Sequence, residues 1–304
     1  MVYFLWVFAL ALASPESDSI LTEPMLGADY QSARATAMGG AQRSIASGID
    51  SIYLNPATMM NKKQYLAEIA YAWGQYSSAH RPFIGVVDSN TTVFAAGIAY
   101  GFEKRFTSGN LDVHRAHFAL GYMYRFLGIG LTGKYIKADR SELDKLNEPY
   151  KSTYKKTTDF FTADLGIIIN PIKQLSVGLV GYNIIPVYRE LAPSALGVAI
   201  SGCFYGFQIA FDTVIDFQSK AYSSTDKKAH AQARYHLGAE YLIKDTLPIR
   251  AGWIFDKIAD SHYWSVGTGY QHRLFIIDFA YRQALDRPVN RYIQLSFAFR
   301  FEAL

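Results

Sequence analysis

The chain has 304 residues, half of them hydrophobic and 15% aromatic, while only 18% are charged and the formal net charge is +4. A typical soluble domain carries about 25% charged residues, so the surface of this protein is less charged than the surface of a protein in water usually is. A chain with so many apolar residues is not intrinsically disordered. No cluster of Lys and Arg indicates a nucleic-acid partner, and the single cysteine, Cys203, excludes a disulfide framework and a cysteine-ligated metal.

The N-terminal residues have the features of a signal peptide. Residues 2–12 form a short apolar run, and Ala11-Leu12-Ala13 matches the small-x-small pattern of a signal-peptidase site. We therefore expect a signal peptide over residues 1–13, followed by a polar, mobile leader over residues 14–26. A membrane-spanning helix needs about 20 apolar residues, a length that no uninterrupted stretch of the chain reaches. If the mature protein lies in a membrane, it crosses as strands.

Residues 27–62 are rich in small side chains and have a helical or irregular pattern. Gly39 and Gly40 permit tight turns. Asn55 suits the N-cap of a helix whose first residue is Pro56. This segment therefore differs in kind from the rest of the chain.

From Tyr65 to the C-terminus, apolar residues alternate with small or polar ones. In the clearest strand, Asp112–Phe126, the even positions are apolar and the odd positions are small or charged, so the two kinds of side chain point to opposite faces. The outward apolar belt is expected to include Phe118, Leu120, Tyr122, Ile209, Phe211, Leu237, Ile277, Leu295 and Phe297.

A soluble barrel gives the same alternation, but two features favour a membrane barrel. The apolar face is rich in aromatic residues while the opposite face is rich in Gly, Ala and charge, the inverse of a soluble barrel. The expected strands often have about 10–14 residues, as a tilted membrane strand requires, whereas soluble strands average about 5–6. The fold class predicted for residues 63–304 is therefore all-β, a transmembrane antiparallel β-barrel.

The connections between the expected strands alternate in length. The strands are placed at 65–76, 80–88, 91–104, 112–126, 128–139, 158–169, 174–187, 194–204, 206–218, 231–243, 248–257, 262–271, 273–284 and 291–301. Outer-membrane barrels have an even strand count, short periplasmic turns and longer external loops. We therefore expect about fourteen strands in the outer membrane of a bacterial cell, with outer-membrane lipid around the barrel. Such a barrel encloses more space than its inward side chains fill, so residues 27–62 are expected to form a helical or irregular plug, or hatch, in the lumen. The alternative is a polar leader in the periplasm.

The residues expected to face the lumen carry about as many acids as bases. The acids are Glu68, Asp164, Asp212, Asp216, Glu240, Asp256 and Asp278, and the bases are Arg115, Arg125, Lys134, Arg234, Arg250, Arg282 and Arg300. An ion-selective pore would have a biased ring of charge. The balance favours a network of ion pairs between wall and plug, with Arg115, Arg125, Asp212, Arg234, Glu240, Arg250, Asp278 and Arg300 at its centre; solvated lumen charge is the alternative.

The sequence contains no recognised catalytic motif. Neither Gly-x-Ser-x-Gly nor His-Glu-x-x-His occurs. His117 and His236 are expected in the lumen as hydrogen-bonding wall residues, although a lipid-hydrolysing enzyme stays open as a third hypothesis. We expect no enzyme activity, no cofactor and no metal.

The segment Ala33–Ala57 carries a resemblance to known barrels. Its Gly39-Gly40 pair and its Asn55-Pro56-Ala57 before the first strand resemble the N-terminal signature shared by the FadL-type transporters of long fatty acids and the PorV/PorQ-type barrels of the type IX secretion system. Ala163-Asp-Leu-Gly166, Leu179-Val-Gly-Tyr-Asn183, Leu237-Gly-Ala-Glu-Tyr241, Pro248-Ile-Arg-Ala-Gly-Trp253 and Asp278-Phe-Ala-Tyr281 are more similar to the PorV/PorQ side. The resemblance implies fourteen strands and an N-terminal segment inside the lumen. This chain has shorter external loops than most members.

Two functions follow from the resemblance. The later segments favour a type IX-like secretion or surface-assembly component that binds secretion-system proteins. The alternative is a passive transporter that admits a hydrophobic ligand past the plug. Pro82 and Gly85, in one strand, fit a kink through which such transporters release ligand sideways, and equally fit an ordinary edge irregularity.

Overall fold

The computed structural model describes residues 31–75, 78–105, 111–140, 157–187, 191–217, 231–257, 259–286 and 290–301. The expected signal peptide over residues 1–13 and leader over residues 14–26 lie outside these ranges. Within the described ranges, no helix is both long and apolar enough to cross a membrane.

Most of the described residues are in strands. The elements in chain order are α2 (Ala33–Ala37), α3 (Ile49–Leu54), the 3₁₀ helix η2 (Pro56–Asn61), β1 (Tyr65–Gly74), β2 (Ala79–Asp88), β3 (Phe94–Arg105), β4 (Leu111–Tyr124), β5 (Leu127–Arg140), β6 (Thr157–Ile172), β7 (Leu175–Tyr182), β8 (Ala195–Phe204), β9 (Phe207–Asp216), β10 (Gln232–Ile243), β11 (Leu247–Asp256), β12 (Ser261–Gln271), β13 (Phe275–Ala284) and β14 (Arg291–Phe301).

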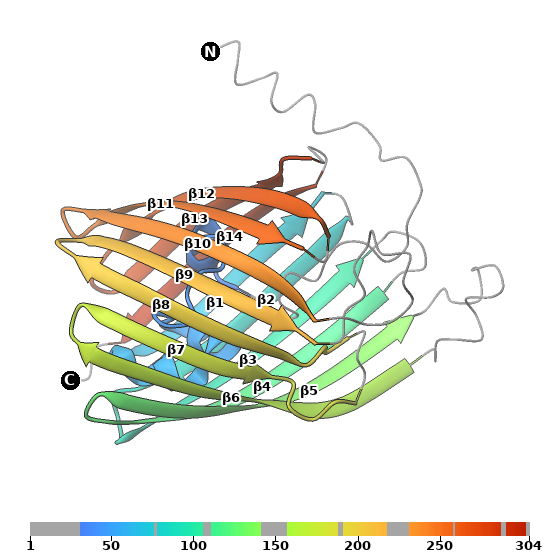
Figure 1. Ribbon diagram of the computed structural model, residues 1–304, viewed down its shortest axis with the longest axis horizontal. Helices are drawn as coiled ribbons and strands as arrows, with labels where there is room; N and C mark the ends of the chain where they lie inside the picture. Colours follow the sequence, from blue (N-terminus) through green and yellow to red (C-terminus); the bar gives the residue numbers. More distant parts are fainter. Residues whose placement is uncertain are drawn as a thin grey trace, which may run out of the picture.

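The fourteen strands form a closed antiparallel barrel in which each strand pairs with its sequence neighbours (Figure 1). Closure joins β1 to β14, from Tyr65 opposite Phe301 to Gly74 opposite Tyr292. A closed sheet has no free edge, so every strand has a hydrogen-bonding partner on both sides. The predicted fold class and strand count are confirmed.

The two faces of the wall differ as the alternation predicts. Phe118, Leu120, Leu237 and Leu295 are 44–54% exposed on the outer face. The other members of the expected outward belt are also exposed, except Tyr122, which is half-buried. The inner face carries small residues together with most of the buried charged side chains. The barrel is therefore apolar outside and polar inside, the arrangement of a membrane barrel.

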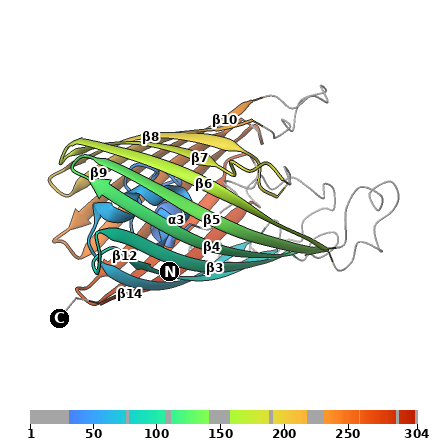
Figure 2. The same ribbon diagram turned by 90° about the horizontal axis from the view of Figure 1, so that it is seen from below.

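The two ends of the barrel also differ (Figures 1 and 2). One end, here the turn end, has short connections such as Arg125-Phe126, Tyr205-Gly206 and residues 244–246. At the other end, the link end, consecutive strands are separated by more residues of sequence, as between Arg140 of β5 and Thr157 of β6 and between Asp216 of β9 and Gln232 of β10. The first residue of β1, Tyr65, pairs with the last residue of β14, Phe301. The N-terminal end of β1 and the C-terminal end of β14 therefore both lie at the turn end.

Two strand ends differ from the expected ones, and the pairing of one strand is interrupted at the proline where the sequence indicates an irregularity. β4 stops at Tyr124, so Arg125 lies in the turn with a φ of 56° and its side chain is exposed over the Tyr124 ring instead of facing the lumen. β7 stops at Tyr182, five residues before the expected end, because Asn183 has a φ of 49° and its N–H donates to the Asp164 carboxylate at 2.8 Å. In β2, Pro82 and Arg81 pair with β1 but not with β3, an interruption consistent with the missing N–H of proline.

The segment from Gln31 to Asn61, called the plug below, lies inside the barrel toward the turn end (Figures 1 and 2). Ser32 caps α2, and its side chain accepts a hydrogen bond from the Ala35 N–H at 3.2 Å. Asn55 caps η2, whose first residue is Pro56, and accepts from the Ala57 N–H at 3.1 Å. Gly39 and Gly40 have φ values of 64° and 74° and form the turn after α2.

Candidate functional site at the plug and the barrel wall

The plug backbone lies directly on glycines of the wall. A Cβ atom at Gly178 would lie 2.6 Å from the Arg43 carbonyl oxygen, and one at Gly128 would lie 3.0 Å from the Ala57 carbonyl oxygen. At Gly130 it would overlap the backbone between Pro56 and Ala57. Since contacts under 3.0 Å are not tolerated, the plug backbone can lie this close to the wall only where the wall residue is glycine.

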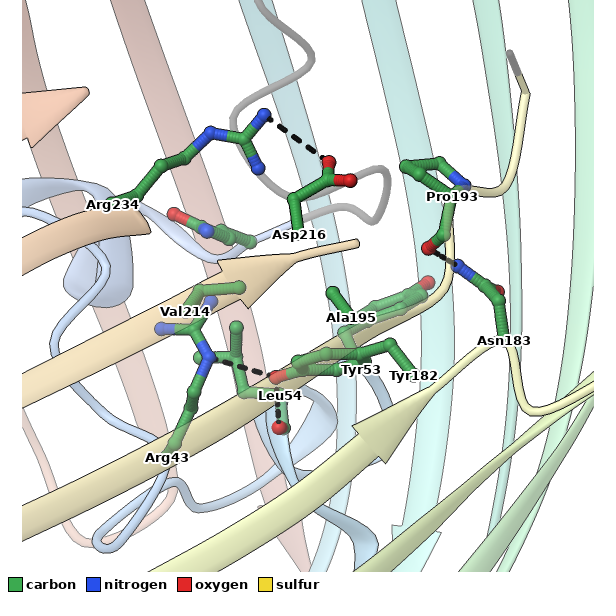
Figure 3. Close-up of a pocket in the computed structure, with 11 residues that line it drawn as sticks. Arg43, Tyr53, Leu54, Tyr182, Asn183, Pro193, Ala195, Val214, Asp216 and Arg234 are labelled. Carbon is green, nitrogen blue, oxygen red and sulfur yellow. Dashed lines mark hydrogen bonds and ion pairs between the residues drawn. The ribbon is translucent and has the colours of Figure 1, made fainter. Parts of the chain in front are cut away.

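Arg43 forms hydrogen bonds both to the wall and within the plug (Figure 3). It is 2% exposed, and its guanidinium pairs with Asp212 of β9 at 3.1 Å, donates to the Tyr182 hydroxyl at 2.8 Å and donates to the Gly40 carbonyl at 2.9 Å. The Arg43 N–H also donates to Asp212, at 2.9 Å. The Tyr182 hydroxyl then donates to the Leu54 carbonyl at 2.5 Å. These bonds join two strands of the wall to two separate turns of the plug.

A second buried ion-pair cluster joins α2 to β10, β11 and β13. Arg34 donates to both carboxylate oxygens of Glu240 at 3.0 Å. Arg250 pairs with the same Glu240 at 2.5 Å and with Asp278 at 2.7 Å. Paired charges of this kind are costly to separate, because each partner would be left in a poorly solvated site.

Neutral hydrogen bonds complete this side of the interface. His236 donates to the Gly39 carbonyl at 2.7 Å, and the Ser265 hydroxyl donates to the Ala37 carbonyl at 2.9 Å. The Thr36 hydroxyl donates to the Gln294 side chain at 2.6 Å, and the Ser44 hydroxyl donates to the Ser201 hydroxyl at 2.8 Å. We call the contacts of residues 31–47 with β7–β14 the anchored side of the plug. His236 thus acts as the wall residue that was expected.

The opposite side of the plug contacts the wall through apolar groups. Cβ atoms at Gly85 and Gly97 would lie 2.9 Å from Ile49 and 2.8 Å from Ile52, and one at Gly121 would lie 3.4 Å from the Met59 Cβ. We call this contact the apolar seam; it comprises Ile49, Ile52, Tyr53 and Met59 of the plug with Leu66, Phe83, Val87, Ala95, Ala99 and Ala119 of β1–β4, all buried.

Asp50 joins the two helices of the plug. Its carboxylate accepts from the Ser32 N–H at 2.7 Å and from the Ser32 hydroxyl at 2.5 Å. Burial raises the pKa of Asp50 above its ordinary value of 3.8, an effect that the Ser32 hydrogen bonds and the charge of Arg34 oppose.

Further charged clusters lie on the inner wall toward the link end. Glu103 pairs with Arg81, Arg105 and Arg115, at 3.1, 2.5 and 3.2 Å. Fully buried Lys134 pairs with Asp164 at 2.6 Å. Arg234 pairs with Asp256 at 3.1 Å and with Asp216 at 3.8 Å.

A cavity of about 30 Å³ lies beside Arg43 and Tyr182 (Figure 3). Its lining includes Tyr53 and Leu54 of α3, Asn183 and Pro193 beyond β7, and Asp216 and Arg234 of the wall. A buried water needs about 10–15 Å³ of such space, so the cavity accommodates one or two waters and no larger molecule without movement of the plug or wall.

Neither a protein-family model nor a curated protein sequence matches the chain. Several solved structures do. The toluene transporter TbuX of Ralstonia pickettii superposes with a TM-score of 0.61 at 14% identity, over 89% of this chain and 97% of that chain. The toluene transporter TodX of Pseudomonas putida gives 0.63 at 12% identity, over 89% and 97%. A Pseudomonas aeruginosa FadL homologue gives 0.58 at 13% identity, over 88% and 96%.

The chain shares the barrel fold of these solved structures. At such low identity the match establishes the fold alone, and it spans nearly the full length of each of these proteins. It does not distinguish the PorV/PorQ type that the later sequence segments favour.

Within this barrel, the residues expected in one lumen network separate into several groups. Asp212 binds the plug through Arg43, while Glu240, Arg250 and Asp278 form the cluster around Arg34. Arg115 and Arg234 belong to the clusters nearer the link end. Arg300 lies half-buried on the inward face at the turn end of β14. Arg125 is the one residue of the network that was placed wrongly, because the strand ends one residue before it.

Several residues of the site were not predicted. Arg34, Arg43 and Asp50 lie in the plug, where no alternation indicates which way a side chain points. Glu103 and Tyr182 lie in strands, and extending the alternation through β3 and β7 would have placed both in the lumen.

Proposed function

We propose that this protein is an outer-membrane transporter that admits a small hydrophobic molecule past its plug and catalyses no reaction. The observation that carries the proposal is the plug itself, which lies inside the barrel toward the turn end with its backbone packed against glycines of the wall. A lumen filled in this way suits neither an open pore for polar solutes nor an ion channel. A molecule that passes must displace part of the interface, which favours solutes that can replace apolar contacts.

The exterior supports a position in the outer membrane. Apolar side chains such as Ile98, Phe118 and Ile249 are 62%, 54% and 53% exposed on the outer face, and exposed apolar area of this extent requires lipid. We infer that the turn end faces the periplasm and the link end faces outward, since bacterial barrels have short periplasmic turns. TodX and TbuX, which share the fold, are named as toluene transporters, so an apolar aromatic is a suitable first probe.

The test is uptake of radiolabelled toluene by cells that lack their own hydrophobic transporters. Cells that produce this protein should accumulate toluene faster than cells with an empty vector, while uptake of a polar solute such as glucose stays unchanged. Equal toluene uptake in the two strains would contradict the proposal.

The second candidate function is a type IX-like secretion or surface-assembly component. Its support is the sequence pattern of segments such as Ala163–Gly166, Leu179–Asn183 and Leu237–Tyr241. A secretion component should crosslink to protein partners, and its deletion should leave cargo in the periplasm. A strain with normal toluene uptake and retained cargo after deletion would favour this function over transport.

A further inference from the structure

The contacts of the plug with the wall are divided by chemistry. On the anchored side, Arg34 and Arg43 form ion pairs with Glu240 and Asp212. On the opposite side, Ile49, Ile52 and Met59 present hydrocarbon and thioether groups to β2, β3 and β4. The two kinds of contact respond differently to an incoming molecule.

Separating the anchored side would leave buried charges and hydrogen-bonding groups without partners, which is costly for any incoming molecule. Separating the apolar seam removes mainly apolar contacts, together with the Tyr53–His117 ring contact and one hydrogen bond, from Thr132 of β5 to the Ile52 carbonyl at 3.0 Å. An apolar molecule that enters the seam replaces these contacts with its own and keeps the surfaces out of water. A polar molecule would lose its hydration there and gain no hydrogen bond in return.

The apolar seam is continuous with the cavity beside Arg43. Tyr53 lines that cavity (Figure 3), and its ring also contacts Phe83 at 6.1 Å and His117 at 4.9 Å between centroids. From Tyr53 the seam runs along α3 and η2 through Ile52 and Met59. Val87, near the turn that follows β2, belongs to the same cluster.

We propose that the apolar seam between the plug and β1–β4 is the transport route, and that it selects small uncharged apolar molecules while the anchored side holds the plug in the barrel. This inference rests on the proposed transport function and names its route. The plug pivots about its ion pairs and does not leave the lumen.

Two disulfide tethers test the route. Both are built with the exposed Cys203 replaced by Ser. M59C/G121C crosses the seam, where the two Cβ positions are 3.4 Å apart, close to the range of about 3.5–4.5 Å found in disulfides. The new Cβ at residue 121 also lies 2.9 Å from the Pro56 carbonyl oxygen, so the folding of the reduced variant is checked first by its gel mobility before and after boiling. S44C/S201C crosses the anchored side, where the two hydroxyl oxygens are 2.8 Å apart.

Oxidation of M59C/G121C should reduce toluene uptake at least tenfold, and reduction with dithiothreitol should restore it. Oxidation of S44C/S201C should leave uptake unchanged. If both tethers block uptake, the whole plug must move. If only S44C/S201C blocks uptake, the route lies on the anchored side. If neither tether blocks uptake, the plug is not displaced during transport. Each of these results overturns the seam and leaves the transport function intact, whereas no uptake by the untethered protein refutes the transport function itself.

A polar substitution tests the seam without a tether, in case the reduced M59C/G121C protein is inactive. I52Q places an amide in the seam and should lower toluene uptake at least tenfold. I254Q places the same amide in the separate buried cluster of Ile254, Tyr263 and Ala284 and should have no such effect. The barrel state of both variants is checked by the different gel mobilities of unheated and boiled protein. Equal uptake by folded I52Q and the wild type would overturn the proposal.

Discussion

Replacement of Arg43 by Met removes a fully buried attachment of the plug to the wall. The variant leaves the Asp212 carboxylate, which is 0% exposed, without its guanidinium partner at 3.1 Å. The Tyr182 hydroxyl loses a donor at 2.8 Å and the Gly40 carbonyl loses one at 2.9 Å. The backbone N–H of residue 43 continues to donate to Asp212.

The loss of stability in R43M depends on the buried groups that are left without a partner. Removing one partner of a buried ion pair costs about 3–5 kcal/mol. Because one backbone hydrogen bond to Asp212 is retained, we expect a loss near the lower limit, about 3 kcal/mol. That is roughly a hundredfold change in the unfolding equilibrium, since about 1.4 kcal/mol corresponds to a factor of ten.

The assay is urea unfolding in detergent micelles, followed by tryptophan fluorescence. The double variant R43M/D212L removes both charges and should recover most of the loss, because replacing a buried pair with apolar groups is close to neutral. In planar bilayers, R43M should also open more often than the wild type. A free energy of unfolding for R43M within about 0.5 kcal/mol of the wild type, or a double variant no more stable than R43M, would refute this account of the attachment.

Three further predictions concern the plug and its fit. Deletion of residues 27–60 should convert a nearly silent barrel into one with large, steady conductance in planar bilayers; an intact protein that already conducts like an open porin would contradict it. G130A should lower the free energy of unfolding by about 1–3 kcal/mol, because the new Cβ meets plug backbone at Pro56. G133A, in the same strand, meets only one atom at 3.9 Å and should change it by less than about 0.5 kcal/mol; equal effects would rule out the glycine fit. Burial raises the pKa of Asp50, so its contribution to stability is present at low pH and is lost as the pH rises through the raised pKa. As the pH rises above the ordinary carboxyl pKa of 3.8, D50N should therefore lose less stability than the wild type, as the urea midpoint measures, and parallel pH profiles would contradict the burial argument.

The barrel was predictable because its signal is local and repeated. Phe118 and Leu120 on one face, with His117 and Ala119 on the other, suffice to orient β4, and neighbouring strands repeat the pattern. Strand ends were less predictable. β7 ends at Asn183 because the N–H of that residue finds the Asp164 carboxylate nineteen positions earlier in the chain, a contact that alternation does not contain.

The plug was predictable as a segment but not in its attachments. Small residues and Asn55-Pro56 mark it as distinct from the strands. Its partners are remote, since Arg34 and Glu240 are separated by 206 positions and Arg43 and Asp212 by 169. The alternation of apolar and polar residues in β9 and β10 placed Asp212 and Glu240 in the lumen correctly. A periodic pattern does not indicate which plug residue binds either of them.

The division of the plug interface also bears on the order of assembly. The partners of the apolar seam, β1–β4, follow the plug directly in the chain, whereas the anchored side needs residues as distant as Gln294, which is 258 positions from Thr36. Contacts between near neighbours in sequence form with a smaller entropic cost than distant ones. We therefore expect α3 and η2 to rest first on the nascent N-terminal strands, and the ion pairs of Arg43 and Arg34 to form later, once β9 and β10 are in place. The last hydrogen bonds to form would then enclose the plug, so that a chain truncated before β9 would hold its plug with neither of these ion pairs.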